Sequence, residues 1–166
     1  TRVNGASYRF AEAAQRLTAA KASLSDPEAL EIVETAIQRF ELMGRLKAHM
    51  QSDLAGSRLS GVWVAFGGKA DVTGASAEGV TVAPGRIVAW DKIPRDQMLR
   101  LVNAVLARTT VEPAAKSALL LAGAVFCKEI AANVEFALKY RESAVAHRAS
   151  TAALADRLLG GAPITK

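Results

Sequence analysis

Residues 57–90 read SRLSGVWVAFGGKADVTGASAEGVTVAPGRIVAW, and this stretch decides the fold because its period differs from that of its flanks. Apolar residues recur at every second position here and at every third or fourth position on either side. The alternating apolar positions are Val62, Val64 and Phe66, then Val80 and Val82, then Ile87 and Ala89. A period of two is typical of β-strands, so a small sheet lies between two helical regions.

The turn signals within this stretch are close together. We expect strands at about 61–67, 70–76, 79–83 and 86–90. Ala77-Glu78-Gly79 and Pro84-Gly85 are typical turn sequences between them. Connections this short join antiparallel neighbours, which predicts a β-meander. Four short strands cannot bury a face alone, so helices must cover them.

Two helices precede the sheet, at about 8–23 and 27–53. The second has apolar residues from Leu30 to Leu54 at intervals of three or four, which describes one continuous stripe. The short break between the helices predicts an antiparallel hairpin. Ser25 and Glu28 have the spacing of a capping box, so we expect Ser25 to cap the second helix.

Helical periods return after the sheet, at about 95–107, 113–128, 131–147 and 150–159. The helix at 113–128 is apolar nearly all round in its second half, so we expect it to be the most buried. In the helix at 131–147 we expect these residues to face inward: Val134, Ala137, Leu138, Ala144 and Val145. The predicted fold class is α+β: a helical hairpin, a four-stranded antiparallel β-meander and a C-terminal helical bundle. We interpret residues 1–166 as one domain, divided into 1–56, 57–92, 93–160 and a tail at 161–166.

Charge and composition restrict the classes of partner. The formal net charge is +5, but the basic residues are spread along the chain and no run of five like charges occurs. This distribution argues against a nucleic-acid site. The apolar run at 119–127 is about half the length of a membrane span, so we expect no membrane span. The chain begins at Thr1 without a methionine, and we interpret it as a processed chain or a piece of a larger protein.

The residues that could perform chemistry form no recognisable set. Cys127, the single cysteine, lies inside the apolar run and is expected to be a small buried residue. His49 and His147 lie far apart without metal-ligand spacing. Glu28, Glu31 and Glu34 are explained by a helix N-terminus and a solvated face, although paired carboxylates can also act as acid and base.

Two further patterns are interpreted structurally. Gly67-Gly68-Lys69 follows a strand, as a phosphate loop does, but the Walker spacing is absent and a strand follows, so we expect a hairpin turn. Thr1 as an N-terminal nucleophile would need an extensive sheet behind it, which the helical N-terminal region does not supply. The sequence therefore predicts no catalytic residue, no metal site and no cofactor.

Trp63 and Trp90 are the candidate binding residues. An exposed tryptophan can anchor a peptide or a sugar, whereas a buried one would lock the sheet onto a helix. We expect Trp90 to be buried because Ile93 and a helix follow at once. Trp63 is open to either interpretation. If this domain recognises a partner, we expect the contact along the edge of the small sheet. If both tryptophans are buried, the sheet is simply structural and gives no functional lead.

The order of elements, together with several short segments, resembles that of a known class of protein regions. Gly79-Val80, then Val88-Ala89-Trp90 and a helix start at Ile93-Pro94, together with LLLAGAVFCKEIAANVEFALKY at 119–140, resemble uncharacterised regions of large multidomain bacterial proteins of the planctomycete type. In those proteins such regions accompany kinase or lectin-like modules. The resemblance spans most of the chain and supplies no catalytic residue.

The helix pair at 113–147 is similar in style to a tetratricopeptide repeat. It departs from that pattern because Glu129-Ile130-Ala131 stands where a small turn residue is expected. A single pair is also too few repeats for such an array.

The leading functional hypothesis is a non-catalytic accessory or protein-interaction domain, whose partner is another protein or a neighbouring domain of the same chain. The alternative is a module that binds an anionic polymer through a diffuse basic surface. An enzyme is the third interpretation, which requires acidic residues of the long helix, a histidine and the sheet edge to converge on one cleft. The compartment and the oligomeric state stay open.

Overall fold

The structure is a computed structural model that describes residues 8–63 and 69–160; the side chains of Val62, Trp63 and Lys69 lie outside this description. The chain forms two compact units, which are described separately. Unit 1 comprises residues 1–45 and 112–166, and unit 2 comprises residues 46–111. Two units that share one continuous helix can belong to one domain, so the single-domain assignment stays a prediction.

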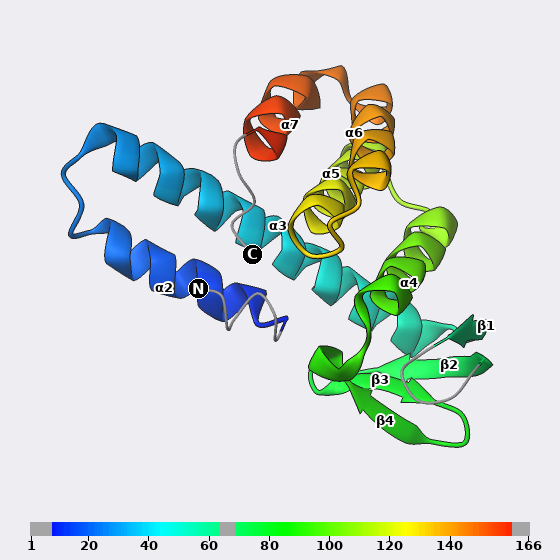
Figure 1. The fold of residues 1–166 in the computed structure, drawn as a ribbon. Helices are drawn as coiled ribbons and strands as arrows, with labels where there is room; N and C mark the ends of the chain where they lie inside the picture. Colours follow the sequence, from blue (N-terminus) through cyan, green and yellow to red (C-terminus); the bar gives the residue numbers. More distant parts are fainter. Residues whose placement is uncertain (1–7, 64–68, 161–166) are drawn as a thin grey trace. The chain divides into compact units, whose positions relative to one another are not determined.

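Unit 1 begins with an antiparallel helical hairpin, as predicted. Helix α2 (Phe10–Lys21) lies beside the first part of α3 (Pro27–Gly56) (Figure 1). A Cβ atom added to Gly44 would lie 3.8 Å from the Cβ of Phe10, and the Lys21 ammonium lies 2.6 Å from the Glu34 carboxylate, which shows the opposed directions. Helix α2 begins at Phe10 rather than at Tyr8, because Tyr8 has a φ of 57°, which is outside the right-handed helical region.

The N-cap of α3 corrects one prediction. The Asp26 carboxylate, rather than the Ser25 hydroxyl, accepts a hydrogen bond from the Ala29 N–H at 3.2 Å. The Asp26 carbonyl also accepts the first helical bond, from Leu30, at 3.0 Å. With Pro27 as the first helical residue, Asp26 occupies the cap position, where a carboxylate also favours the positive end of the helix dipole.

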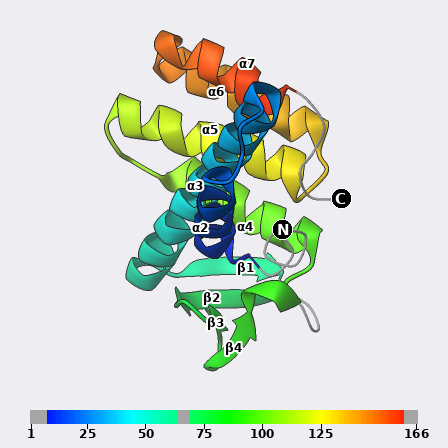
Figure 2. The same cartoon turned by 90° about the vertical axis from the view of Figure 1, so that its left-hand side faces the viewer.

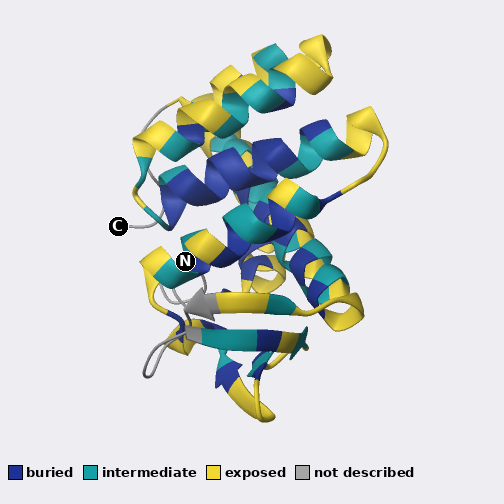
Figure 3. Ribbon diagram, turned by 90° about the vertical axis from the view of Figure 1, so that its right-hand side faces the viewer, coloured by how far each residue is buried: buried dark blue, intermediate teal, exposed yellow. Residues whose placement is uncertain are grey.

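The other helices of unit 1 pack around α5 (Pro113–Glu129). They are α6 (Val134–His147) and α7 (Ala152–Leu159), which is preceded by the 3₁₀ turn Ala149–Thr151. Residues 120–127 of α5 are all buried, and they form a continuous dark-blue segment in Figure 3. The prediction that this helix is the most buried is confirmed.

The inward face of α6 differs from the prediction. Ala137 and Ala144 are buried, whereas Val134 and Leu138 are 67% and 53% exposed, so the expectation that these two residues face inward is wrong. The cause is the contact with α5, since α6 presents small residues that allow two helices to approach closely. The larger side chains at 134 and 138 therefore lie outside that contact.

Unit 2 contains the predicted meander. Its strands are β1 (Leu59–Trp63), β2 (Lys69–Ala75), β3 (Gly79–Val82) and β4 (Arg86–Ala89). They pair in the order β1-β2-β3-β4, and every pair is antiparallel (Figure 2). The first strand begins two residues earlier than expected, and the part of that prediction at 64–67 lies outside the described residues.

The helices of unit 2 bury one side of the sheet. After the 3₁₀ turn Trp90–Lys92, helix α4 (Arg95–Arg108) contacts β1. Buried apolar residues come from three sources, namely the end of α3 (Met50, Leu54), the sheet (Val72, Val80, Val82, Val88) and α4 (Met98, Leu101, Val102, Val105). The α+β fold class and its order of elements are confirmed.

Among residues 8–63 and 69–160, each helix falls short of the length and apolar character that a membrane crossing needs.

Candidate functional site

Trp90 lies inside unit 2, as predicted. Its side chain is 3% exposed, and its indole N–H donates to the Ser76 carbonyl at 3.0 Å. The Gln51 side-chain amide, on α3, donates to the same carbonyl at 2.8 Å. The Lys47 ammonium, one turn earlier on α3, lies 5.4 Å from the centre of the indole ring. Trp90 therefore joins the sheet to α3, and its ring is not available as a large contact surface.

The other candidate binding residue is described only in part. Trp63 is the last residue of β1, but its side chain lies outside the described residues. Gly67 and Gly68 of the predicted hairpin turn, and Thr1, lie outside the described residues altogether. Lys69, the last residue of the predicted turn, is the first residue of β2.

The outer edge of β4 is the candidate site. The sequence indicated the edge of the small sheet but neither the strand nor the residues. Strand β4 is the last in the sheet, and it pairs with β3 through Val80↔Val88, Thr81↔Ile87 and Gly79↔Ala89. The backbone N–H of Trp90 donates to the Glu78 carbonyl, so Glu78 and Trp90 form a hydrogen-bonded pair of the ladder. Bonded pairs alternate with non-bonded pairs in an antiparallel ladder. Val88 therefore bonds to β3, while Ile87 and Ala89 do not.

The consequence is that Ile87 and Ala89 direct their backbone N–H and C=O groups away from β3. No strand of the described chain pairs with this side, which we name the β4 edge (Arg86–Ala89). The Ile87 side chain is 53% exposed, while Val88, on the opposite face, is buried. The β4 edge thus combines unpaired ladder positions with an exposed aliphatic side chain, and such an edge can accept a further strand.

A close approach of the backbone holds β4 against β3. A Cβ atom added to Gly79 would lie 2.2 Å from the Val88 carbonyl oxygen and 2.7 Å from its carbon. Only glycine fits this position without displacement of one strand. Gly79 therefore permits the close approach of β3 and β4.

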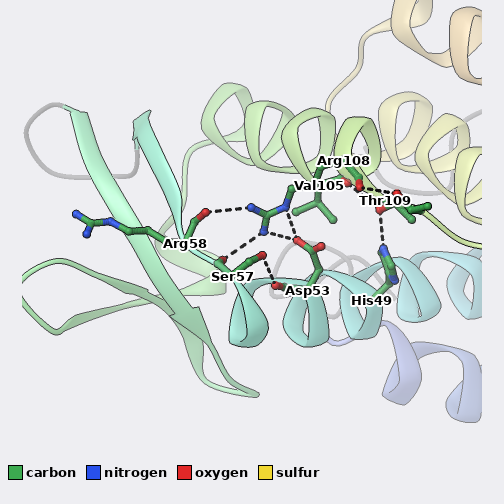
Figure 4. A network of polar contacts seen from close by, with 8 residues as sticks. His49, Asp53, Ser57, Arg58, Val105, Arg108 and Thr109 are labelled. Carbon is green, nitrogen blue, oxygen red and sulfur yellow. Dashed lines mark hydrogen bonds and ion pairs between the residues drawn. The ribbon is translucent and has the colours of Figure 1, made fainter.

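Polar side chains gather at the junction of α3, α4 and β1 (Figure 4). Arg108 donates through Nε to the Asp53 carboxylate at 2.8 Å and pairs with it again through a terminal nitrogen. It also donates to the Arg58 carbonyl at 3.1 Å, just before β1. The Asp53 carboxylate is thus engaged by an arginine that ties the helix ends to the first strand.

His49 belongs to the same junction. Its Nε2 lies 2.8 Å from the Thr109 hydroxyl, and that hydroxyl donates to the Val105 carbonyl at 2.7 Å (Figure 4). Since the hydroxyl has one hydrogen, it must accept from His49, so Nε2 carries the proton. A base that activates Thr109 would need the reverse direction, and Asp53 pairs with Arg108 instead. The arrangement positions backbone and helices rather than a nucleophile.

The remaining chemical candidates are also engaged in structure. Cys127 is fully buried, and burial raises the pKa of its thiol to about 12. His147 is exposed, and its Nδ1 lies 2.8 Å from the Ser143 carbonyl oxygen one turn earlier. In the part of the chain that the structure describes, no three histidine, cysteine, aspartate or glutamate side chains come together as a metal site.

The glutamates at the start of α3 lie on a solvated surface. Glu28, Glu31 and Glu34 are all exposed. The hydrogen bond from Lys21 and its positive charge lower the pKa of the Glu34 carboxyl. A general acid needs a raised pKa, so this shift has the opposite direction.

Sequence reasoning missed a buried ion pair in unit 1. The guanidinium of Arg39 (α3) lies 3.1 Å from the Glu129 carboxylate (α5), and the two side chains are 4% and 0% exposed. Arg39 also donates to the carbonyls of Leu158 and Gly160, at 2.7 and 2.6 Å. Lys128 donates to the Leu159 carbonyl at 2.6 Å. The one available signal was Glu129, which closely follows the apolar run at 119–127.

Comparisons with protein-family models, with curated proteins and with solved structures found no match to this chain.

Proposed function

We propose that this chain is a non-catalytic accessory or protein-interaction domain that contacts its partner along the β4 edge. The engaged states of the chemical candidates support a role other than catalysis. Asp53 pairs with Arg108, the His49 proton is directed at Thr109, and Cys127 is buried as a neutral thiol.

The observation that carries this proposal is the outward direction of the Ile87 and Ala89 backbone beside an exposed isoleucine side chain. A protein that adds an extended segment to such an edge gains main-chain hydrogen bonds, and the side chain of Ile87 gains apolar cover. The buried position of Trp90 moves the expected contact from that tryptophan to the edge itself, while Trp63 stays a candidate.

Proline at position 87 tests the proposal. The Ile87 N–H does not bond to β3, so Ile87→Pro removes an outward donor while the ladder stays intact. The tagged wild-type chain and this variant are each used to capture proteins from extract of the source cells, and the captured proteins are quantified. The melting temperatures of the two chains are measured to show that they are equally stable. We expect a set of proteins that the wild type captures and that Ile87→Pro captures at least about tenfold less, a difference that corresponds to about 1.4 kcal/mol of binding free energy.

Val88→Pro is the matched control, one residue away. The Val88 N–H bonds to β3, so this variant should lower the melting temperature strongly. If Ile87→Pro retains every protein that the wild type retains, the β4 edge is not the contact surface.

Binding of an anionic polymer is the alternative, and it is supported by the net charge of +5. This function requires an affinity that falls steeply with salt concentration. A gel-shift series with single-stranded and double-stranded nucleic acid at low salt distinguishes it, since Ile87→Pro would leave such binding unchanged.

A further inference from the structure

Resting on the proposed function, we propose that the partner segment at the β4 edge is an extended peptide in which aliphatic residues are flanked by acidic residues. The backbone phase of β4, the side chains on its exposed face and the charge of unit 2 together determine the character of this segment.

The backbone phase determines the shape of the segment. Ile87 and Ala89 together offer two N–H donors and two C=O acceptors on one side of the strand. These residues are two positions apart, about 7 Å, which is the repeat of an extended chain. A helix cannot match this repeat, because its own N–H and C=O groups are used internally. The segment must therefore be extended across at least three residues.

The exposed face determines its apolar residues. Ile87 and Ala89 point to the same side of the sheet, where Ile87 is 53% exposed and Ala89 is half-buried. Side chains of an added strand lie beside those of its neighbour on the same face. An aliphatic residue next to Ile87 would remove that side chain from water, which favours valine or isoleucine in the segment.

Charge determines the flanking residues. Arg86 is the one charged residue from Gly79 to Trp90, and it stands at the start of the β4 edge. Unit 2 contains eight lysines and arginines against five aspartates and glutamates, a net charge of +3. Acidic residues beside the segment complement this field, whereas lysines oppose it.

The same charges argue against a second copy as the occupant. Pairing of two β4 edges would bring together two units of net charge +3 and two arginines within one short ladder. Like charges at such a contact oppose association. A second copy is therefore an outcome of the test rather than the proposal.

Two capped peptides serve as probes, Glu-Glu-Ile-Thr-Ile-Glu-Glu and its counterpart with lysine in place of glutamate. Binding to the full chain is followed by the backbone amide resonances of Ile87 and Ala89. The contact is short, so we expect a dissociation constant on the order of 10⁻⁴ M for the acidic peptide. We expect at least about tenfold weaker binding of the lysine peptide, and a loss of this difference in high salt.

Two variants make the test specific. Ile87→Pro should weaken binding of the acidic peptide by at least about tenfold at an unchanged melting temperature. Ile87→Thr keeps the N–H and the β-branched shape but loses aliphatic surface, so its binding should fall between those of the wild type and the proline variant. N-methylation of alternate peptide bonds adds a second readout, because only methyl groups on the side that faces β4 should abolish binding.

Several results would overturn the inference. Equal binding of both peptides would remove the acidic preference, and full binding by Ile87→Pro would remove the edge. Amide shifts at Ile87 and Ala89 that depend on protein concentration alone would show a second copy in that position. If neither peptide binds while cellular proteins are still lost with Ile87→Pro, the inference fails and the proposed function stands. If those proteins are retained, both fail.

Discussion

At the scale of single residues, small and capping side chains decide where the backbone can go. Gly79 allows β3 and β4 to approach to a distance that a methyl group would prevent. Asp26 rather than Ser25 caps α3, since its carboxylate accepts a hydrogen bond from the Ala29 N–H. These positions hold the elements in place.

Gly79→Ala should destabilise the chain by about 1–3 kcal/mol, because the added methyl group overlaps the Val88 carbonyl. Gly74→Ala is the control, since a Cβ there would meet Thr81 at an ordinary 3.7 Å. Urea unfolding followed by circular dichroism measures both. Equal stabilities of the two variants would show that the close approach at Gly79 is not needed.

At the scale of elements, the end of α7 is held by cations from other helices. The last carbonyls of a helix have no partner within it, and a helix of eight residues is marginal alone. Arg39 and Lys128 donate to the carbonyls of Leu158, Leu159 and Gly160, where positive charge also suits the helix dipole. Glu129 balances the charge of Arg39 within the interior.

Glu129→Gln should lower the free energy of unfolding by about 3 kcal/mol, because it leaves the Arg39 charge buried without its carboxylate. Glu142→Gln, on the exposed side of α6, should change it by less than about 0.5 kcal/mol. Urea unfolding measures both variants. A loss below about 1 kcal/mol for Glu129→Gln would mean that the two carbonyl acceptors alone satisfy Arg39.

At the scale of the whole molecule, the single cysteine reports on the integrity of unit 1. Cys127 is fully buried in α5, at the centre of that unit. A thiol whose pKa is raised to about 12 stays neutral near pH 8, and a neutral thiol does not react with disulfide reagents. Its reaction must therefore wait for an opening of the unit.

Modification of Cys127 by an aromatic disulfide reagent at pH 8 should be at least about 10³-fold slower in the native chain than in urea. The chain in urea should release one equivalent of thiolate, which is the control. Stability should also fall as the pH rises above about 9, because the unfolded thiol ionises there while the buried thiol does not. Rapid labelling of the native chain would contradict the burial of α5.

The order of helices and strands along the chain could be predicted from the sequence, because it depends on local pattern. The change of period at 57–90 marked the sheet, and the short turns forced antiparallel neighbours. The apolar run at 119–127 marked the most buried helix, and Ile93 after Trp90 indicated a buried tryptophan. Each of these inferences uses residues that are neighbours in the chain.

The candidate site was predicted only as a region, the edge of the small sheet. Its position at Ile87 and Ala89 depends on the bonding phase between β3 and β4, which no single strand contains. The exposure of Val134 and Leu138 and the partners of Arg39 likewise depend on segments far apart in sequence. The sequence by itself determined the elements and their order, through local period and turn length. The tertiary structure alone decided which groups face outward, because hydrogen-bond phase and close packing are properties of pairs of elements.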